Sequence, residues 1–389
     1  MPPPKRVVIA DDLMTADSAY RLACEGTALL WRGDFQNARQ LLQAMARRAD
    51  KKPRERKNKK TISNPNGHIK PLHTRFPHLN PLPEGEEANE SLRGLQLKEA
   101  FHLHRQAQSQ RARTLGMLLL PFDADHRIPL RRAPDVRAAC TEAYGACTEP
   151  YIASLRGLQG LIGAYEWRKN GVEIPALSAR IHPHYGVFAP IRSEYVGLVA
   201  ETRLPELTET QSVAFDIGTG TGVLAAVLAR RGIKRIVATD QDLRALDCAR
   251  ENLTQLGLIA QVELVQADLF PEGRAPLVVC NPPWIPARPS SPLEHAIFDP
   301  ESRMLLGFLN GLAAHLAPGG EGWLILSDLA EYLGLRTRDE LLAAIDTAGL
   351  KVLDKLDVKP HHPRVSDTSD PLHAARAAEL TSLWRLKVK

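Results

Sequence analysis

The sequence predicts an α/β protein with a Rossmann-like, seven-stranded sheet whose last strand is antiparallel, preceded by a mostly helical N-terminal domain. Three observations predict this fold. From residue 212 onward, short apolar runs alternate with helix-length segments, the pattern of parallel strands joined by crossover helices. The first apolar run ends in a glycine-rich turn. The last two runs, 351–358 and 380–387, have only a Pro/His/Asp-rich loop between them, so we expect them to pair antiparallel.

The first predicted strand and the turn after it form the stretch 212–222, which reads SVAFDIGTGTG. The apolar run ends at Asp216, and an alanine-rich helix former follows at 223–229. Glycines in such a turn let a ligand approach the backbone, and the following helix directs free N–H groups at it. The turn therefore favours a nucleotide-like ligand, and a plain strand-to-helix connection is the alternative.

Three later strands also end in polar residues. The strand 233–239 is closed by Asp240, the strand 262–266 is followed by Asp268, and the strand 277–280 is followed by the sequence NPPW, residues 281–284. Open α/β sheets bind ligands at the carboxyl edge of their strands, so these residues are expected to meet there. For either aspartate alone, capping of the next helix is the alternative reading.

These motifs resemble those of class I S-adenosylmethionine-dependent methyltransferases. The matching pieces are DIGTGTG, Asp240, ADLF and NPPW, and the resemblance covers residues 181–389. NPP with an aromatic residue is similar to the N-methyltransferases of protein glutamine and of adenine N6 or guanine N2 amines. Trp284 stands where tyrosine is usual, which departs from the glutamine branch. A dinucleotide-binding dehydrogenase is disfavoured, because the turn is G-x-G-x-G and Val223 occupies the place of a third small residue.

The resemblance implies a cofactor, S-adenosyl-L-methionine, and a role for each motif residue. Asp216 is expected to hold the methionine ammonium group, and Asp240 to accept the ribose hydroxyls. Asp268 is expected to accept from the adenine amine. The remaining predicted cofactor contacts are Gly218, Thr219, Gly220, Gly222, Gln241, Leu269 and Asn281.

The NPPW motif is the predicted catalytic element. An amide nitrogen is a poor nucleophile, and two acceptors, the Asn281 side-chain oxygen and the Pro282 carbonyl, would hold it with its lone pair toward the methyl group. Pro283 stiffens the loop and Trp284 offers a flat face to a planar acceptor. No metal is expected, because the cofactor's methyl group is already activated.

Several further residues are weaker candidates. Phe188 and Arg192 match loosely a pocket segment of the glutamine enzymes, and packing or surface positions are the alternative. Glu294, His295 and Asp299 are candidate lid residues, with solvated loop as the alternative. We expect His68, His73 and His78 to bind no metal, because no acidic or cysteine partner accompanies them.

Length and composition predict about two domains, and the cysteine pattern favours a cytoplasmic location. It has 389 residues, of which 44% are apolar. Its five cysteines form no C-x-x-C pair, which fits a reducing compartment, and no apolar run is long enough to cross a membrane. Net charge is +5, but residues 47–60 hold nine basic and two acidic residues, or +7, which leaves −2 for the rest.

The N-terminal half carries no chemical motif. Residues 1–49 are expected to form two helices separated at Gly33-Asp34, and 91–180 a helical substrate-recognition domain, the latter by analogy of position alone. Between them, 50–90 is Lys/Arg-rich and then Pro-rich, so we expect a disordered linker or insertion. Residues 181–389 are the predicted methyltransferase domain.

The sequence therefore predicts an N-methyltransferase that acts on a planar amide or amino nitrogen. A glutamine side chain of a translation protein is the first acceptor hypothesis. An exocyclic amine of ribosomal RNA or another nucleic acid is the alternative, and a non-catalytic cofactor-binding scaffold is a third. Oligomeric state cannot be inferred from the sequence.

Overall fold

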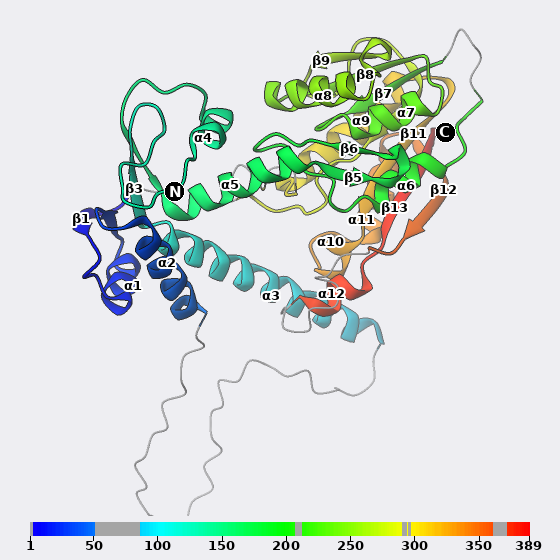
Figure 1. Ribbon diagram of the computed structural model, residues 1–389. Helices are drawn as coiled ribbons and strands as arrows, with labels where there is room; N and C mark the ends of the chain where they lie inside the picture. The colour runs from blue at the N-terminus through cyan, green and yellow to red at the C-terminus, as the bar shows by residue number, and fades with distance from the viewer. Residues whose placement is uncertain (1–2, 51–85, 207–211, 290–293, 295–296, 361–371) are drawn as a thin grey trace, which may run out of the picture.

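The structure is a computed structural model that describes residues 3–50, 86–206, 212–289, 294, 297–360 and 372–389 (Figure 1). In the N-terminal half the elements are β1 (Arg6–Ala10), α1 (Ala16–Cys24), β2 (Thr27–Trp31), α2 (Phe35–Ala49), α3 (Glu86–Leu115), β3 (Leu118–Phe122), α4 (Arg137–Tyr144), β4 (Tyr151–Ser154), α5 (Leu155–Asn170), β5 (Val172–Ile174) and β6 (Ala179–Ile181). In the C-terminal half they are α6 (Glu194–Glu201), β7 (Val213–Ile217), α7 (Val223–Arg230), β8 (Arg235–Asp240), α8 (Leu243–Gln255), β9 (Val262–Gln266), β10 (Ala275–Cys280), α9 (Arg303–His315), β11 (Leu316–Ser327), α10 (Leu329–Tyr332), α11 (Arg338–Thr347), β12 (Leu350–Val358), α12 (His373–Ala378) and β13 (Thr381–Val388).

The C-terminal half folds around a seven-stranded sheet of order β12-β13-β11-β10-β7-β8-β9. The strands β7 to β11 pair in parallel, whereas β13 runs antiparallel to both β11 and β12. The predicted α/β sheet with a reversed last strand is therefore confirmed. The strand β7 lies between β8 and β10, so its carboxyl end is flanked by the ends of both neighbours.

Helices cover both faces of this sheet, which explains why its central strands are apolar along their whole length. Side chains of α6 and α7 form one buried cluster with residues of β7, β8 and β10. Side chains of α9 and α11 form a second cluster on the other face. The helix α7 is buried from Val223 to Ala229, which agrees with its uninterrupted apolar sequence.

The N-terminal half contains the expected helices and, in addition, a four-stranded sheet of order β1-β2-β3-β4 that the sequence reading missed. Residues 27–31 lie within the region predicted to be helical, but they form β2, where Leu29 and Leu30 pair with Leu118 and Leu119 of β3. After Thr27 the run ALLW is apolar at every position, so its sequence shows no periodicity that would distinguish a strand from a turn of a buried helix.

The sheet joins the parts of the chain on either side of the basic and proline-rich stretch, because β2 and β3 are neighbours. Of the range 50–90 that was expected to be disordered, residues 86–90 instead begin the helix α3. Residues 51–85 lie outside the described residues, and so do His68, His73 and His78.

Two long helices connect the N-terminal sheet with the C-terminal half. In Figure 1, α3 and α5 both run from the N-terminal sheet toward the seven-stranded sheet. The helix α5 leads into the β5–β6 hairpin, whose Ile174 and Ile181 are fully buried in the same cluster as α6 and α7. None of the helices in the described ranges has the length and apolar character needed to cross a membrane.

Candidate functional site

The glycine turn joins β7 to α7 at the carboxyl edge of the sheet. Thr219 N–H donates to the Thr239 carbonyl at 2.8 Å, and Gly220 N–H donates to Asp240 Oδ2 at 3.0 Å. Gly220 has a φ of +55°, and a Cβ added there would have no heavy atom within 4 Å. The turn thus presents open space in front of Gly220, where a side chain would otherwise project.

The other two glycines face protein atoms instead. A Cβ at Gly222 would lie 3.1 Å from Cβ of Ala249, so this glycine permits α7 to pack on α8. A Cβ at Gly218 would lie 2.5 Å from Cε of Met304, a flexible side chain of α9. Among these three glycines, therefore, only Gly220 borders open space, although we expected such space next to all three. We call this space the open cradle.

Asp216 is a buried carboxylate with one unused oxygen. Its side chain is enclosed at the end of β7, and Oδ2 accepts from Thr219 Oγ1 at 2.7 Å and from Ala225 N–H at 3.1 Å. Oδ1 is buried and has no hydrogen-bond partner among the described residues. Burial raises the pKa of Asp216 to about 6, although both hydrogen bonds favour the charged form. A buried oxygen without a donor is costly, and an ammonium group would satisfy it.

Asp240 closes β8 beside the same turn. Its two oxygens accept from the N–H groups of Gly220 and Asp242, each at 3.0 Å. Burial raises the pKa of Asp240 above its ordinary value. The neighbouring Gln241 has an exposed side chain, and its carbonyl accepts from Gln266 at 3.2 Å. Asp240 therefore couples the end of β8 to the glycine turn.

Asp268 and Leu269 lie where β9 ends, but both are engaged by other parts of the protein. The Asp268 carboxylate is exposed and forms an ion pair with Arg303, the first residue of α9, at 2.7 Å. The Leu269 carbonyl accepts from Thr239 Oγ1 at 2.5 Å, and its side chain packs against Gly307. Sequence reasoning did not foresee Arg303, because nothing in its local sequence distinguishes it from a surface arginine.

The NPPW motif follows β10 directly. Because Cys280 of β10 pairs in register with Ile217 of β7, Asn281 comes next to the start of the glycine turn. The Trp284 indole N–H donates to Asn281 Oδ1 at 2.9 Å. This bond was not predicted, and it fixes the Asn281 oxygen while leaving it a second lone pair.

Arg192 and Tyr195 enclose Trp284 from the start of α6. The Arg192 guanidinium carbon lies 5.1 Å from the centroid of the Trp284 ring, and Tyr195 meets that ring edge-on with centroids 6.5 Å apart. Arg192 also donates to Glu379, which is 3% exposed, at 3.0 Å. Phe188 is half-buried and packs against the α6–α7 cluster. The structure thus brings Arg192 to the motif, and adds Tyr195 and Glu379, which sequence reasoning missed.

The candidate lid residues have other positions. Asp299 is only 5% exposed, and its carboxylate accepts from the N–H groups of Met304 and Leu305 at 3.0–3.1 Å. It therefore caps α9, and the alternative of a solvated loop position is wrong for Asp299. Glu294 forms an ion pair with Arg105 at 3.2 Å, and His295 lies outside the described residues.

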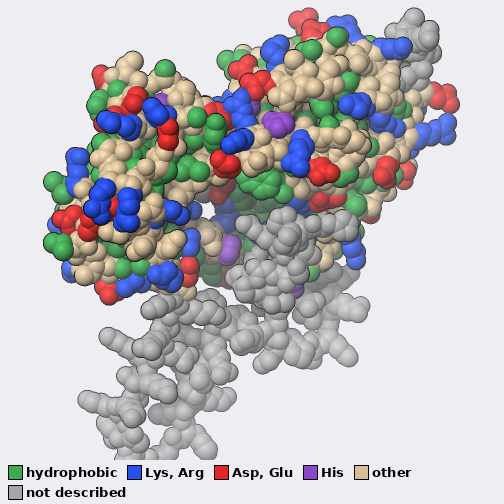
Figure 2. Space-filling model, viewed as in Figure 1, with side chains coloured by type: hydrophobic (Ala, Val, Ile, Leu, Met, Phe, Trp, Pro, Cys, Tyr) green, Lys and Arg blue, Asp and Glu red, His purple; other side chains and the backbone are tan. Residues whose placement is uncertain are grey.

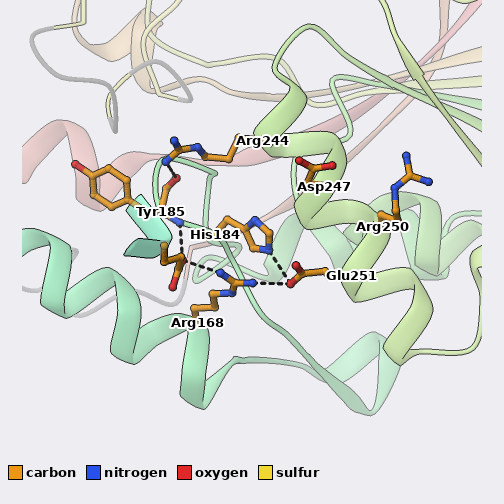
Figure 3. Close-up of a pocket in the computed structure, with 8 residues that line it drawn as sticks. Arg168, His184, Tyr185, Arg244, Asp247, Arg250 and Glu251 are labelled. Carbon is orange, nitrogen blue, oxygen red and sulfur yellow. Dashed lines mark hydrogen bonds and ion pairs between the residues drawn. The ribbon is translucent and has the colours of Figure 1, made fainter. Parts of the chain in front are cut away.

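A charged cleft of about 430 Å³ lies between α5 and α8 (Figure 3). Arg168 of α5 bonds to Glu142 at 3.1 Å and to Glu251 of α8 at 2.6 Å, and His184 also bonds to Glu251 at 2.8 Å. Arg244 donates to the carbonyls of residues 185 and 143, both at 3.1 Å. Helical periodicity puts Arg244 and Glu251 on the face of α8 opposite the one that packs on the glycine turn. The cleft is therefore an interface between the two halves of the chain, separate from the turn.

The chemistry of the donor set suits an organic ligand with a cationic end. Across the resolved positions no cluster of three or more His, Cys, Asp or Glu side chains has a metal-binding arrangement. The site instead fits an ammonium group joined to a sugar. Asp216 has a buried oxygen without a donor, Gly220 leaves open space, and Asp240 supplies a second carboxylate on the adjacent strand.

Comparison with known proteins agrees with this geometry. Residues 179–335 match the sequence profile of the methyltransferase small domain, which confirms the methyltransferase resemblance for that region. The chain is 33% identical over 181 residues to the release factor glutamine methyltransferase of Cereibacter sphaeroides, covering 43% of this chain and 62% of the relative. It is 36% identical over 144 residues to the ribosomal protein L11 methyltransferase of Pelotomaculum thermopropionicum, covering 36% of this chain and 39% of the relative.

Among solved structures, a methyltransferase from Pyrococcus furiosus aligns with 59% of this chain and 100% of its own, at 20% identity and a TM-score of 0.39. The chain spans less than two thirds of the length of either curated relative.

Proposed function

We propose that this chain, whose residues 179–335 match the methyltransferase small domain, transfers a methyl group from S-adenosylmethionine to a planar amide or amino nitrogen. One observation carries the proposal. The buried, unpartnered Asp216 oxygen and the open Gly220 turn lie beside the Asn281 motif on the adjacent strand. This arrangement supports a cation-binding role for Asp216 and a nitrogen-binding role for Asn281 at one edge of the sheet.

The residues present fit the cofactor. The Asp216 carboxylate would bind the ammonium end through Oδ1, and Asp240 would accept a ribose hydroxyl. The missing side chain of Gly220 leaves room for the ligand against the backbone. Asp268 uses one oxygen for Arg303, so its other oxygen is the one we assign to the adenine amine. When bound, the cofactor supplies a methyl group that its sulfonium already activates for displacement.

The chain's own contribution is to hold the acceptor nitrogen. The Asn281 oxygen and the Pro282 carbonyl would each accept one N–H, which directs the lone pair away from the motif and toward the methyl group. Charge that develops on the nitrogen during transfer strengthens both hydrogen bonds, so they stabilise the transition state more than the ground state. Because Trp284 already fixes the Asn281 oxygen, little reorganisation is needed when the acceptor binds.

For the acceptor we propose the glutamine side chain of a protein of the translation machinery, encountered in the cytoplasm. The names of the two relatives support a translation component, and one of them names glutamine. The net charge of +7 over residues 47–60 favours a second candidate, an exocyclic amine of ribosomal RNA. On the face shown in Figure 2, basic and acidic side chains are intermixed over the described surface, which suits a protein acceptor equally well.

Transfer of tritiated methyl groups distinguishes these acceptors. The purified chain is incubated with labelled S-adenosylmethionine and an extract from cells that lack it, and the product is divided between nuclease and protease. Label released by protease but stable to nuclease supports the protein acceptor. Label released by nuclease alone identifies RNA instead. Absence of label in both fractions, with the cofactor bound, would contradict the proposed transfer and leave the cofactor-binding scaffold.

A further inference from the structure

The helix α3 reaches from the N-terminal half to the segment that follows the NPPW motif. We call the described residues 285–289, 294 and 297–299 the post-motif segment. Phe101 of α3 is 4% exposed and packs in one buried cluster with Ile285 of this segment and with Leu329 and Leu372. In Figure 1 α3 passes α10 and α12, which contribute Leu329, Ala330 and Ala375 to that cluster.

Arg105 lies one turn beyond Phe101 and makes three contacts with the post-motif segment. Its Nη2 donates to the Arg288 carbonyl at 2.7 Å and to Glu294 Oε2 at 3.2 Å. Its guanidinium carbon lies 3.8 Å from the centroid of the Phe298 ring. A planar guanidinium can donate in its plane and stack on a ring with its face at the same time, whereas an ammonium group cannot.

These three contacts tie together two parts of the post-motif segment, residue 288 on one side and residues 294 and 298 on the other. The two parts are also joined directly, by a parallel bridge between Ile285 and Phe298 and by Asp299 N–H, which donates to the Ile285 carbonyl at 2.8 Å. Arg105 therefore holds both described parts of the segment from the side of α3.

Both ends of the clamped segment lead to the site. Ile285 directly follows Trp284, which holds the Asn281 oxygen. Asp299 caps α9 at Met304, and the Met304 side chain lies against Gly218 of the glycine turn. A displacement of the post-motif segment would thus move the acceptor-binding motif and the helix that covers the turn together.

The partners of Arg105 lie far along the chain from it, 183 and 189 residues away. Another arginine of the same helix, Arg111, pairs instead with Asp50 at the end of α2, at 2.7 Å and 3.0 Å. Arg111 therefore anchors α3 to the N-terminal half, whereas Arg105 contacts the post-motif segment. Arg111 provides a matched control for Arg105.

We infer that Arg105 is a positioning residue for the acceptor site. It holds the post-motif segment, and through it the orientation of Trp284, so that the N-terminal half sets the geometry of the motif. The inference rests on the proposed function only where it calls this the acceptor site.

Fluorine NMR of the full chain labelled with 5-fluorotryptophan tests this role, because the sequence has five tryptophans and Trp284 is assigned by the line that Trp284→Phe removes. We expect Arg105→Ala to shift or broaden the Trp284 line, and Arg111→Ala to leave it in place. Arg105→Lys keeps the charge but loses the planar fork, so a smaller shift in the same direction is expected. If Arg105→Ala does not fold, the lysine variant alone decides the test. An unchanged Trp284 line in a folded Arg105 variant, or an equal change in Arg111→Ala, would overturn the inference.

Titration of the same samples with S-adenosylmethionine separates this inference from the proposed function. Because the post-motif segment also leads through Asp299 and Met304 to the glycine turn, we expect Arg105→Ala to bind S-adenosylmethionine more weakly but measurably, together with the altered Trp284 line. Weaker binding with an unchanged Trp284 line would contradict a role that acts through the motif. Absence of binding in the wild type would contradict the proposed function, while the NMR result would still decide whether Arg105 positions Trp284.

Discussion

At the scale of single residues, the proposal depends most on Asp216. The fold surrounds this acid with apolar strands and supplies donors for only one of its oxygens. Since the unfolded chain hydrates both oxygens, the folded protein favours the protonated form, and the pKa of Asp216 rises to about 6. The contribution of Asp216 to stability is therefore present at low pH and is lost as the pH rises through about 6.

Cofactor binding should have the opposite pH dependence, because an ammonium group pairs with the ionised carboxylate. We expect affinity for S-adenosylmethionine to be constant between about pH 6 and pH 7, where the cofactor's α-ammonium group remains charged, and to fall by about tenfold per pH unit below pH 6, as for competition by one proton. Calorimetric titration between pH 5 and pH 8 measures this. Asp216→Asn should bind more weakly and lose the dependence.

Asp328 supplies the control for that titration. Burial also raises the pKa of Asp328 to about 6, but this residue lies at the end of β11 and accepts from Leu380 N–H at 2.7 Å. Asp328→Asn should keep the pH profile of the wild type. A profile that survives in Asp216→Asn, or disappears in Asp328→Asn, would show that another group governs binding.

At the scale of elements, the glycine turn contains one glycine that permits packing, Gly222, and one, Gly220, to which we assign cofactor binding. Gly222→Ala would place a methyl group 3.1 Å from Cβ of Ala249 at a φ of +78°, so we expect both backbone strain and overpacking. Together these lower the free energy of unfolding by about 2–3 kcal/mol. Gly220→Ala meets no atom within 4 Å, so strain alone acts there, and the loss is about 1 kcal/mol.

The effect on cofactor affinity should be reversed. Gly220→Ala fills the open cradle and should reduce affinity more than tenfold, whereas Gly222→Ala should retain binding once folded. Urea unfolding and calorimetry on both variants check this pair. Wild-type affinity in Gly220→Ala would be incompatible with our placement of the cofactor.

The C-terminal elements could be predicted because pattern and motif coincide there. The turn after Asp216 and the polar ends of four strands follow from local sequence, and the antiparallel last strand follows from the absence of a crossover helix. The N-terminal sheet could not be predicted in this way. The strand β2 is short and has no alternation of polar and apolar residues after Thr27, and its pairing with β3 spans a long separation in sequence.

Within the site, the missed contacts share one physical cause. Glu379 and Arg303 reach Arg192 and Asp268 from elements far along the chain, and a charged residue in a loop or at a helix start has no local signal of its partner. The bond from Trp284 to Asn281 is local, but it depends on the rotation of the indole ring, which the two prolines before it do not determine.

At the scale of the whole molecule, the two halves meet through α3 and through the cleft between α5 and α8 (Figures 1 and 3). In that cleft Arg168 joins Glu142 and Glu251, and the Glu142 side chain is only 10% exposed. Removal of Arg168 would leave a nearly buried carboxylate without its charge partner. The network therefore contributes to the association of the halves.

We expect Arg168→Ala to lower the free energy of unfolding by about 1–2 kcal/mol, an amount already reduced for the partial exposure of the pair. Arg137→Ala is the control, because Arg137 pairs with Asp135 two residues away and both side chains are exposed. Its urea midpoint should equal that of the wild type. Equal midpoints for both variants would mean that the cleft contributes no stability.

The central claim is that Asn281 holds the nitrogen that receives the methyl group. The most direct test compares tritium transfer from S-adenosylmethionine by the wild type and by Asn281→Ala, with calorimetry showing that both are saturated with the cofactor. Our account predicts that the wild type labels its acceptor and that Asn281→Ala is at least 100-fold slower, on the order of the loss when one transition-state hydrogen-bonding group is removed. Transfer by Asn281→Ala at the wild-type rate would contradict it.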